Sequence, residues 1–203
     1  MTVDQKTTQQ IQRIYDDLAR DWRRHGIGNT ILGINRHRSM FKQATGDVLD
    51  VACGTGENFK YLTLAESVTA TDLSSAMVAR ARRRTADVTV TMGDAQAMEF
   101  EDDSFDTVVS ALSTCTFPDY VAAFNEMRRV VKPGGAIMLL EHGRSSIGWI
   151  ARRQDRSGVY KSMEHGGCRS NRDVGSEIDA AGLNVVSHQR THFGMIHRFV
   201  IEV

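Results

Sequence analysis

The stretch that decides the fold runs from Asp47 to Asn58 and reads D-V-L-D-V-A-C-G-T-G-E-N. Val48 to Val51 is apolar apart from Asp50, which is typical of a buried strand. Cys53 to Gly56 holds only small residues and predicts a tight turn, and we expect a helix over Glu57 to Ala65. A strand, a glycine turn and a helix bring backbone N–H groups and a helix N-terminus close to a ligand. The stretch therefore indicates a nucleotide-type cofactor site.

Two kinds of cofactor compete for this turn. The dinucleotide fingerprint G-x-G-x-x-G needs a third glycine, but Gly54 and Gly56 are followed by Phe59 at that position. This disfavours a pyrophosphate, and with it a nicotinamide-dependent oxidoreductase. An adenosine joined to an amino acid through a sulfonium needs the same close approach of the backbone. It also carries an ammonium group, which Asp50 is placed to meet.

The motif D-V-A-C-G-T-G resembles motif I of the class I S-adenosylmethionine-dependent methyltransferases, where Ala52 is usually glycine. The resemblance implies an α/β fold: a Rossmann-like, doubly wound, seven-stranded sheet, mostly parallel with an antiparallel C-terminal strand. It implies S-adenosyl-L-methionine as cofactor and S-adenosyl-L-homocysteine as product. We expect residues 1–203 to form a single domain, with residues 1–45 as a helical lid and residues 143–170 as a helix and loop inserted over the site.

Composition excludes several classes of partner. Among 203 residues, Lys and Arg number 25 and Asp and Glu number 25, so nothing favours a nucleic acid. The three cysteines are odd in number and lack metal-type spacing, so we expect neither a disulfide framework nor a metal site, and a cytoplasmic location. Apolar runs stay well short of the ~20 residues that span a bilayer, so no stable membrane insertion is expected. We expect a monomer or homodimer acting on a small-molecule acceptor.

The second strand, Ser67 to Asp72, also ends in an acid. Asp72 follows Gly56 by sixteen residues, close to the interval at which a carboxylate reaches ribose hydroxyls in nucleotide folds. Leu73 would then lie against one face of the adenine. The alternative is a helix start with Ser74 as N-cap, and both interpretations can hold together.

The resemblance supplies the rest of the cofactor site. After the strand Asp87 to Met92, it implies that Asp94 accepts a hydrogen bond from the adenine amino group and that the backbone of Ala95 donates to a ring nitrogen. The strand Asp106 to Leu112 ends at the ligand edge of the sheet. The expected cofactor-binding residues are Asp50, Ala52, Gly54, Gly56, Asn58, Asp72, Leu73, Asp94, Ala95, Ser110 and Ala111.

Two residues are the candidates for catalysis. Residues 7–25 predict an amphipathic helix whose Y-D-x-x-A resembles the opening of the ubiquinone/menaquinone and phospholipid methyltransferases, which implies that Tyr15 and Asp16 face the methyl-transfer centre. His142, just after the predicted fifth strand, is the first candidate for a general base because an unperturbed histidine has a pKa of about 6.5. A histidine that only bonds backbone carbonyls is the alternative, and His165 is a further candidate base.

The C-terminal half predicts a helix over Pro118 to Val131 and a second over Asn171 to Ala181, with Asn171 as N-cap. Leu183 to Gln189 and Met195 to Val203 predict a closing strand pair. L-E-H-G followed by G-G-C-x-x-N-R-D resembles the thiol S-methyltransferases and phosphatidylethanolamine N-methyltransferases. We therefore expect in-line methyl transfer to S, N or O of a small molecule. The alternatives are a quinone-type C-methyltransferase, a phospholipid head-group N-methyltransferase, and a non-catalytic cofactor-binding protein.

Overall fold

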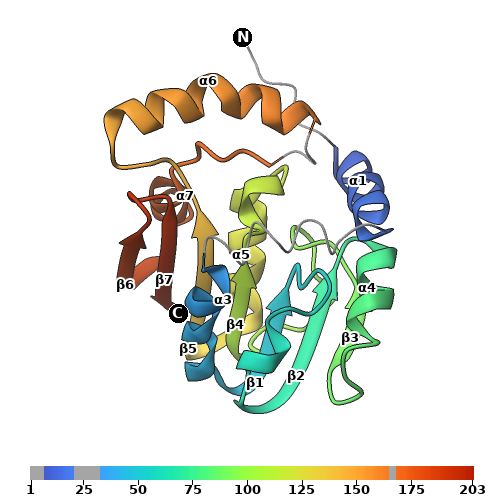
Figure 1. Ribbon diagram of the computed structural model, residues 1–203. Coiled ribbons are helices and arrows are strands. Elements are labelled where there is room, and N and C mark those ends of the chain that lie inside the picture. The colour runs from blue at the N-terminus through green and yellow to red at the C-terminus, as the bar shows by residue number, and fades with distance from the viewer. Residues whose placement is uncertain (1–6, 21–32, 165–167) are drawn as a thin grey trace.

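The computed structural model describes residues 7–20, 33–164 and 168–203 (Figure 1). Across these residues the chain forms one seven-stranded sheet in the order β3-β2-β1-β4-β5-β7-β6. Strand β7 runs antiparallel to β5 and β6, and the other neighbouring strands are parallel. This confirms the expected doubly wound, mostly parallel sheet. The strands are β1 (Thr45–Val51), β2 (Leu64–Asp72), β3 (Thr89–Met92), β4 (Phe105–Ala111), β5 (Val131–His142), β6 (Asn184–Thr191) and β7 (Ile196–Glu202).

Helices cover both faces of the sheet. In Figure 1, α6 lies across the top of the molecule, beyond the carboxyl ends of the parallel strands, and α1 stands beside α4. None of the described helices is both long and apolar enough to cross a bilayer. The helices are α1 (Thr8–Arg20), α3 (Ile34–Arg38), α4 (Ser75–Ala81), α5 (Tyr120–Val130), α6 (Gly148–Glu164) and α7 (Val174–Ala180), with the 3₁₀ turns η1 (Ser39–Gln43), η2 (Phe59–Tyr61) and η3 (Thr114–Thr116).

The central strands have apolar side chains on both faces, as expected for a parallel sheet covered by helices on both sides. Val108 of β4 packs in the cluster that contains Phe124 of α5 and Ile178 of α7. Its neighbour Val109 belongs to the opposite cluster, which contains Phe41 of η1. All five side chains are fully or almost fully buried, so the sheet is a rigid base for the residues at its strand ends.

Two of the predicted helices are wrong in detail. Glu57 to Ala65 contains only the short turn η2, and β2 already begins at Leu64. The side chain of Asn58 makes buried hydrogen bonds with Asp50 and Arg38, and these hold the residues after the glycine turn in a non-helical path. Helix α7 begins at Val174 with Asp173 as its N-cap, because Asn171 donates instead to Asp155.

Other element boundaries differ by less. The helix predicted over residues 7–25 is present as α1, and the last five of these residues lie outside the described part of the chain. Between α1 and β1, the described residues form the short helix α3 and the turn η1, which follow each other directly. Strand β5 begins at Val131, and its register with β4 shifts between Val131 and Ala136, where the Lys-Pro-Gly-Gly sequence includes Gly134 with a φ of 78°.

Candidate active site

A cleft with about 980 Å³ of space, partly open to solvent, lies at the carboxyl end of the sheet. Its walls come from the ends of β1, β2, β3 and β4, from the segment after η3, and from one side of α1. Ligands of open α/β sheets bind at this edge, where the loops that follow the strands converge. Most of the residues predicted to bind the cofactor line this cleft, and the others lie behind its wall.

The turn after β1 brings its backbone to the cleft. Ala52 and Gly54 both line it, with φ of 54° and 56°. This left-handed conformation explains why glycine is usual at position 52, since a side chain there costs roughly 1–2 kcal/mol. A Cβ added to Gly54 would meet nothing within 4 Å, but one added to Gly56 would lie 2.4 Å from the ring of Phe59. Gly56 does not line the cleft, so its role is to make room for Phe59.

Asp72 lines the cleft at the end of β2 and is 8% exposed. Its Oδ2 accepts a hydrogen bond from the backbone N–H of Gly54 at 2.8 Å, and its Oδ1 accepts from that of Ser74 at 2.9 Å. Burial raises the pKa of Asp72, and these two hydrogen bonds oppose the shift. The hydroxyl of Ser74 accepts from the N–H of Met77, so the expected N-cap and the expected cleft residue occur together. Leu73 lines the cleft beside them.

Asp94 and Ala95 also line the cleft, after β3. The carboxylate of Asp94 accepts from the backbone N–H and from the side-chain amide of Gln96, both at 2.9 Å. The amide oxygen of Gln96 in turn accepts from the N–H of Asp119 at 2.7 Å. Gln96 itself lines the cleft and was missed in the sequence. The signal for it was the Asp-x-Gln spacing, which suits a side chain that folds back onto the aspartate.

Asp50 lies behind the wall of the cleft rather than in it. Its Oδ1 accepts from the side-chain amide of Asn58 at 2.9 Å, and the amide oxygen of Asn58 accepts from Arg38. Asn58 and Arg38 line the cleft, whereas Asp50 does not. Burial raises the pKa of Asp50 to about 7, although Asn58 and the charge of Arg38 both lower it. Asn58 thus stands between Asp50 and the cleft, and the expected contact of Asp50 with a ligand stays a prediction.

Ser110 is also behind the cleft. Its hydroxyl donates to the backbone oxygen of Val51 at 2.8 Å and lies 2.6 Å from the hydroxyl of Ser113. Ala111 lines the cleft as expected, and it is followed there by Leu112 and Ser113, which the sequence prediction did not include. Leu112 has a φ of 57°, so the chain turns sharply at the end of β4 and presents the residues after the strand.

Tyr15 and Asp16 are neighbours in α1, but their side chains point in different directions. Tyr15 lines the cleft, as the sequence predicted. Burial, together with the nearby thiols of Cys115 and Cys168, raises the pKa of Tyr15, so its phenol stays protonated and can donate a hydrogen bond. Asp16 points to the start of α4, where it accepts from the Ser74 hydroxyl at 2.6 Å and from the N–H of Ala76 at 3.1 Å. Asp16 therefore holds α1 in position and does not line the cleft.

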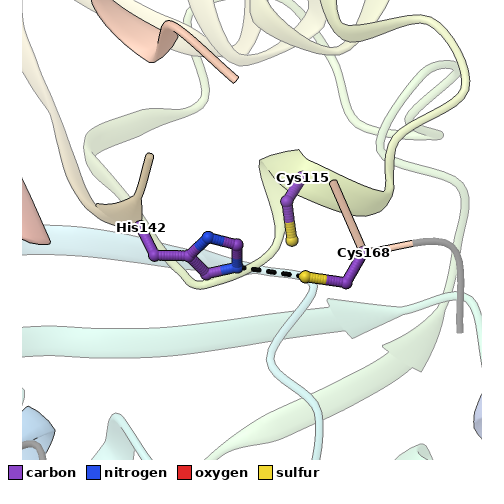
Figure 2. Close-up of side chains that lie close together, drawn as sticks. All are labelled: Cys115, His142 and Cys168. Carbon is purple, nitrogen blue, oxygen red and sulfur yellow. Dashed lines mark hydrogen bonds between the residues drawn. The ribbon is translucent and has the colours of Figure 1, made fainter. Parts of the chain in front are cut away.

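His142 does not line the cleft either. Its Nε2 lies 3.2 Å from the Sγ of Cys168, and Cys115 completes a group of three side chains (Figure 2). Burial lowers the pKa of His142, but contact with Cys168 and the charge of Glu141 outweigh it, so the pKa is raised overall. The expected free base at the end of β5 is thus engaged with a thiol. His165, the other candidate base, lies outside the described residues.

Comparison with known proteins agrees with this geometry. Residues 49–139 match the family model of a methyltransferase domain. The yeast (Saccharomyces cerevisiae) mitochondrial methyltransferase OMS1 is 32% identical over 182 residues, which cover 78% of this chain and 38% of OMS1. The demethylmenaquinone methyltransferase of Shouchella clausii is 31% identical over 153 residues, covering 67% of this chain and 65% of that enzyme. The chain thus spans less than two thirds of the length of either relative.

A solved structure shows the same fold. A chain in the complex between the Haloferax volcanii Trm112 methyltransferase activator and the protein named there as a methyltransferase superposes with a TM-score of 0.73. It is 19% identical and covers 93% of this chain and 96% of its own length. The motif after β1, the matched domain and the seven-stranded sheet agree, and the chain belongs to the class I S-adenosylmethionine-dependent methyltransferases.

Proposed function

We propose that this chain transfers the methyl group of S-adenosylmethionine to a sulfur, nitrogen or oxygen atom of a small acceptor. The observation that carries the proposal is the cleft in which Gly54, Asp72 and Asp94 follow three neighbouring strands. A nucleoside needs an acceptor for its ribose hydroxyls, polar groups for its base and close access to the backbone. These three residues offer one of each.

The residues that line the cleft suit the cofactor in their donor and acceptor chemistry. The carboxylate of Asp72 would accept from the ribose, Asp94 from the adenine amino group, and the N–H of Ala95 would donate to the ring. Leu73 would cover one face of the base. When bound, the cofactor supplies a methyl group on a positively charged sulfur.

The chain's own task would then be to position the acceptor and to exclude water. Tyr15 and Leu112 line the same cleft, and α1 closes one of its sides. Alignment of the reacting atoms can account for up to ~7–11 kcal/mol of the barrier. Asp50 would act through its charge, because Asn58 stands between it and the cleft. We expect its ionised form to favour the cofactor's ammonium group.

A second candidate function is C-methylation of a quinone-type ring. The observation in its favour is the identity of 31% with demethylmenaquinone methyltransferase. A phospholipid head group is a further acceptor class that we propose as an alternative. We further propose that the protein acts in the cytoplasm, without nucleic acid, as a monomer or homodimer; the mitochondrial location in OMS1's name is the alternative.

The experiment is incubation with S-adenosylmethionine carrying a labelled methyl group and a panel of thiols, amines, phenols, quinols and phospholipids. Label should appear in at least one acceptor class, and at limiting cofactor its transfer should be slower when Asp72 is replaced by alanine. Cofactor binding without transfer to any acceptor would favour a non-catalytic binding protein. Tighter binding of NAD than of S-adenosylmethionine would favour an oxidoreductase instead.

A further inference from the structure

Three side chains with metal-binding chemistry meet beside the cleft without a role in the proposed cofactor site. Cys115 comes from η3, His142 ends β5, and Cys168 follows α6 (Figure 2). The two Sγ atoms and a ring nitrogen of His142 all lie within 4.8 Å of one another. Figure 2 shows both sulfur atoms directed toward the space between the three residues.

The spacing of these atoms is close to that of a metal site. In a tetrahedral zinc site, Zn–S bonds of about 2.3 Å and Zn–N bonds of about 2.0 Å separate the ligand atoms by roughly 3.5–3.8 Å. The Cys168 Sγ to His142 Nε2 distance is 3.2 Å, so an ion would need these atoms to move apart by only a few tenths of an ångström. Two thiolates and an imidazole select zinc or a similarly thiophilic ion over magnesium or calcium.

The surroundings hold the three ligands in place, and the charges of Glu141 and Arg172 both act on Cys115 and His142. The backbone N–H of Arg169 donates to the carbonyl of Cys115 at 3.3 Å, which fixes the segment after α6 against η3. Glu141 is fully buried and lies within electrostatic reach of Cys115 and His142. One of its carboxylate oxygens has no hydrogen-bond partner among the described residues. A buried carboxylate in this state is stabilised by a nearby positive charge.

The group also adjoins the cleft. Ser113 and Thr116, on either side of Cys115, line the cleft, and so does Tyr15. The phenol of Tyr15 lies within electrostatic reach of the thiols of Cys115 and Cys168. An ion held by the three ligands would therefore lie at the wall where an acceptor must approach the methyl group. The sequence prediction of no metal site rested on spacing, which cannot detect ligands from three separate parts of the chain.

We propose that Cys115, His142 and Cys168 bind a zinc-type ion whose remaining position takes the thiolate of the methyl acceptor. The metal part stands alone, and the acceptor part rests on the proposed methyltransferase function. The acceptor thiol gives its proton to solvent when its sulfur binds the ion, as metal-bound thiols do. That sulfur then forms the new S–CH₃ bond while the S–CH₃ bond of the sulfonium breaks. The electron pair stays on the departing S-adenosylhomocysteine, and the neutral thioether product leaves the metal.

The first experiment measures metal in protein purified with a reducing agent and without chelator. We expect about one zinc per chain by elemental analysis, the fourth ligand position being open as in catalytic sites. Reduced, metal-free protein titrated with Co²⁺ should develop the visible bands of a tetrahedral ion and a sulfur-to-cobalt charge-transfer band. Cofactor is absent from both measurements, so they do not depend on methyl transfer.

Variants identify the ligands. Cys115→Ser, Cys168→Ser and His142→Ala should each lower zinc affinity on the order of 100-fold or more, since even residues that only support metal ligands contribute 10–100-fold. Cys53→Ser is the matched control, because Cys53 is buried like Cys115 but lies outside the group. It should bind the metal like the wild type. No stoichiometric metal in the reduced protein, a Cys115–Cys168 disulfide in its place, or an equal loss in Cys53→Ser would overturn the metal site.

The second experiment tests the acceptor. A small aliphatic thiol should intensify the sulfur-to-cobalt band, and removal of zinc should lower the rate of thiol methylation at least about 10-fold. An unchanged spectrum, or equal rates with and without zinc, would contradict the acceptor role. Calorimetry of S-adenosylhomocysteine binding to the metal-free protein tests the cofactor cleft separately. If S-adenosylhomocysteine fails to bind to the metal-free protein, the proposed function is contradicted, while the metal measurements remain valid.

Discussion

The two glycines of the turn after β1 differ in what surrounds them, although both have positive φ. We predict that Gly56→Ala lowers the free energy of unfolding by about 2–4 kcal/mol, because its Cβ would overlap the ring of Phe59 and the backbone would be strained. Gly54→Ala should cost only about 1–2 kcal/mol, since its Cβ meets open space. Urea unfolding measures both values, and equal losses would contradict the packing role of Gly56.

Cofactor affinity should show the opposite order, with a larger loss for Gly54→Ala than for Gly56→Ala. Gly54 lines the cleft and Gly56 does not, so a methyl group at position 54 occupies space that a ligand needs. Calorimetry with S-adenosylhomocysteine should show the larger loss of affinity for Gly54→Ala, measured at a temperature where both variants are folded.

Asp50 gives the protein a specific pH dependence. Its pKa is about 7 in the folded protein against 3.8 unfolded, so the folded state holds an extra proton between these values. The stabilisation from the protonated form is therefore present below about pH 4 and is lost as the pH rises through 7. Asp50→Asn should gain up to about 4 kcal/mol relative to the wild type between pH 4 and pH 8. Urea unfolding at both pH values measures this, and a constant difference would show that Asp50 does not titrate in this range.

At the scale of elements, the carboxylate of Asp16 joins α1 to the start of α4, and the guanidinium of Arg80 in α4 also donates to the backbone oxygen of Ala19 in α1. Asp16 accepts from Ser74 and Ala76 at the start of α4. We predict that Asp16→Ala lowers stability by about 1 kcal/mol, the usual effect of losing a helix cap. It should also speed amide exchange in α1 and weaken cofactor binding, because α1 carries Tyr15 into the cleft.

Asp17 provides the control for this change. It is the next residue in α1, and its side chain is 74% exposed and paired with the exposed Arg20. Asp17→Ala should leave exchange in α1 and cofactor affinity close to the wild type. If the two alanine variants behave alike, α1 is not held by the hydrogen bonds of Asp16.

The elements also show which features the sequence could predict. Strands β1 and β4 were visible as short apolar runs, because strands buried on both faces need apolar residues throughout. Ser74 was recognised as an N-cap because the chemistry of a cap is local. The helix expected from Glu57 was wrong because a tertiary network at Asn58 outweighed local propensity. The sequence thus predicted the features that depend on neighbouring residues, which are the buried strands and the helix cap.

The same reasoning explains the site. Asp72 and Asp94 could be predicted because the carboxyl ends of parallel strands meet at one edge of the sheet. The position of Asp50 behind Asn58 could not, since it depends on how side chains pack beneath the turn. The meeting of Cys168 with His142 depends on the return of the chain after α6, which no sequence spacing encodes.

At the scale of the whole molecule, the sheet brings the ends of its strands together while α1 supplies a separate wall. The central claim is that this arrangement binds a sulfonium nucleoside through Asp72. The carboxylate of Asp72 already accepts two backbone hydrogen bonds, which fix its orientation before a ligand arrives. A hydrogen bond to a charged group contributes about 1.5–3 kcal/mol, so its loss corresponds to roughly a 10- to 100-fold change in affinity.

The most direct measurement is a calorimetric titration of wild-type protein and Asp72→Ala with S-adenosylhomocysteine, with NAD as the comparison ligand. Circular dichroism on the same samples establishes that the variant remains folded. The account predicts that the wild type binds S-adenosylhomocysteine more tightly than NAD, and that the folded variant binds it about 10- to 100-fold more weakly. Equal affinity in the two proteins, or a wild type that binds only NAD, would contradict it.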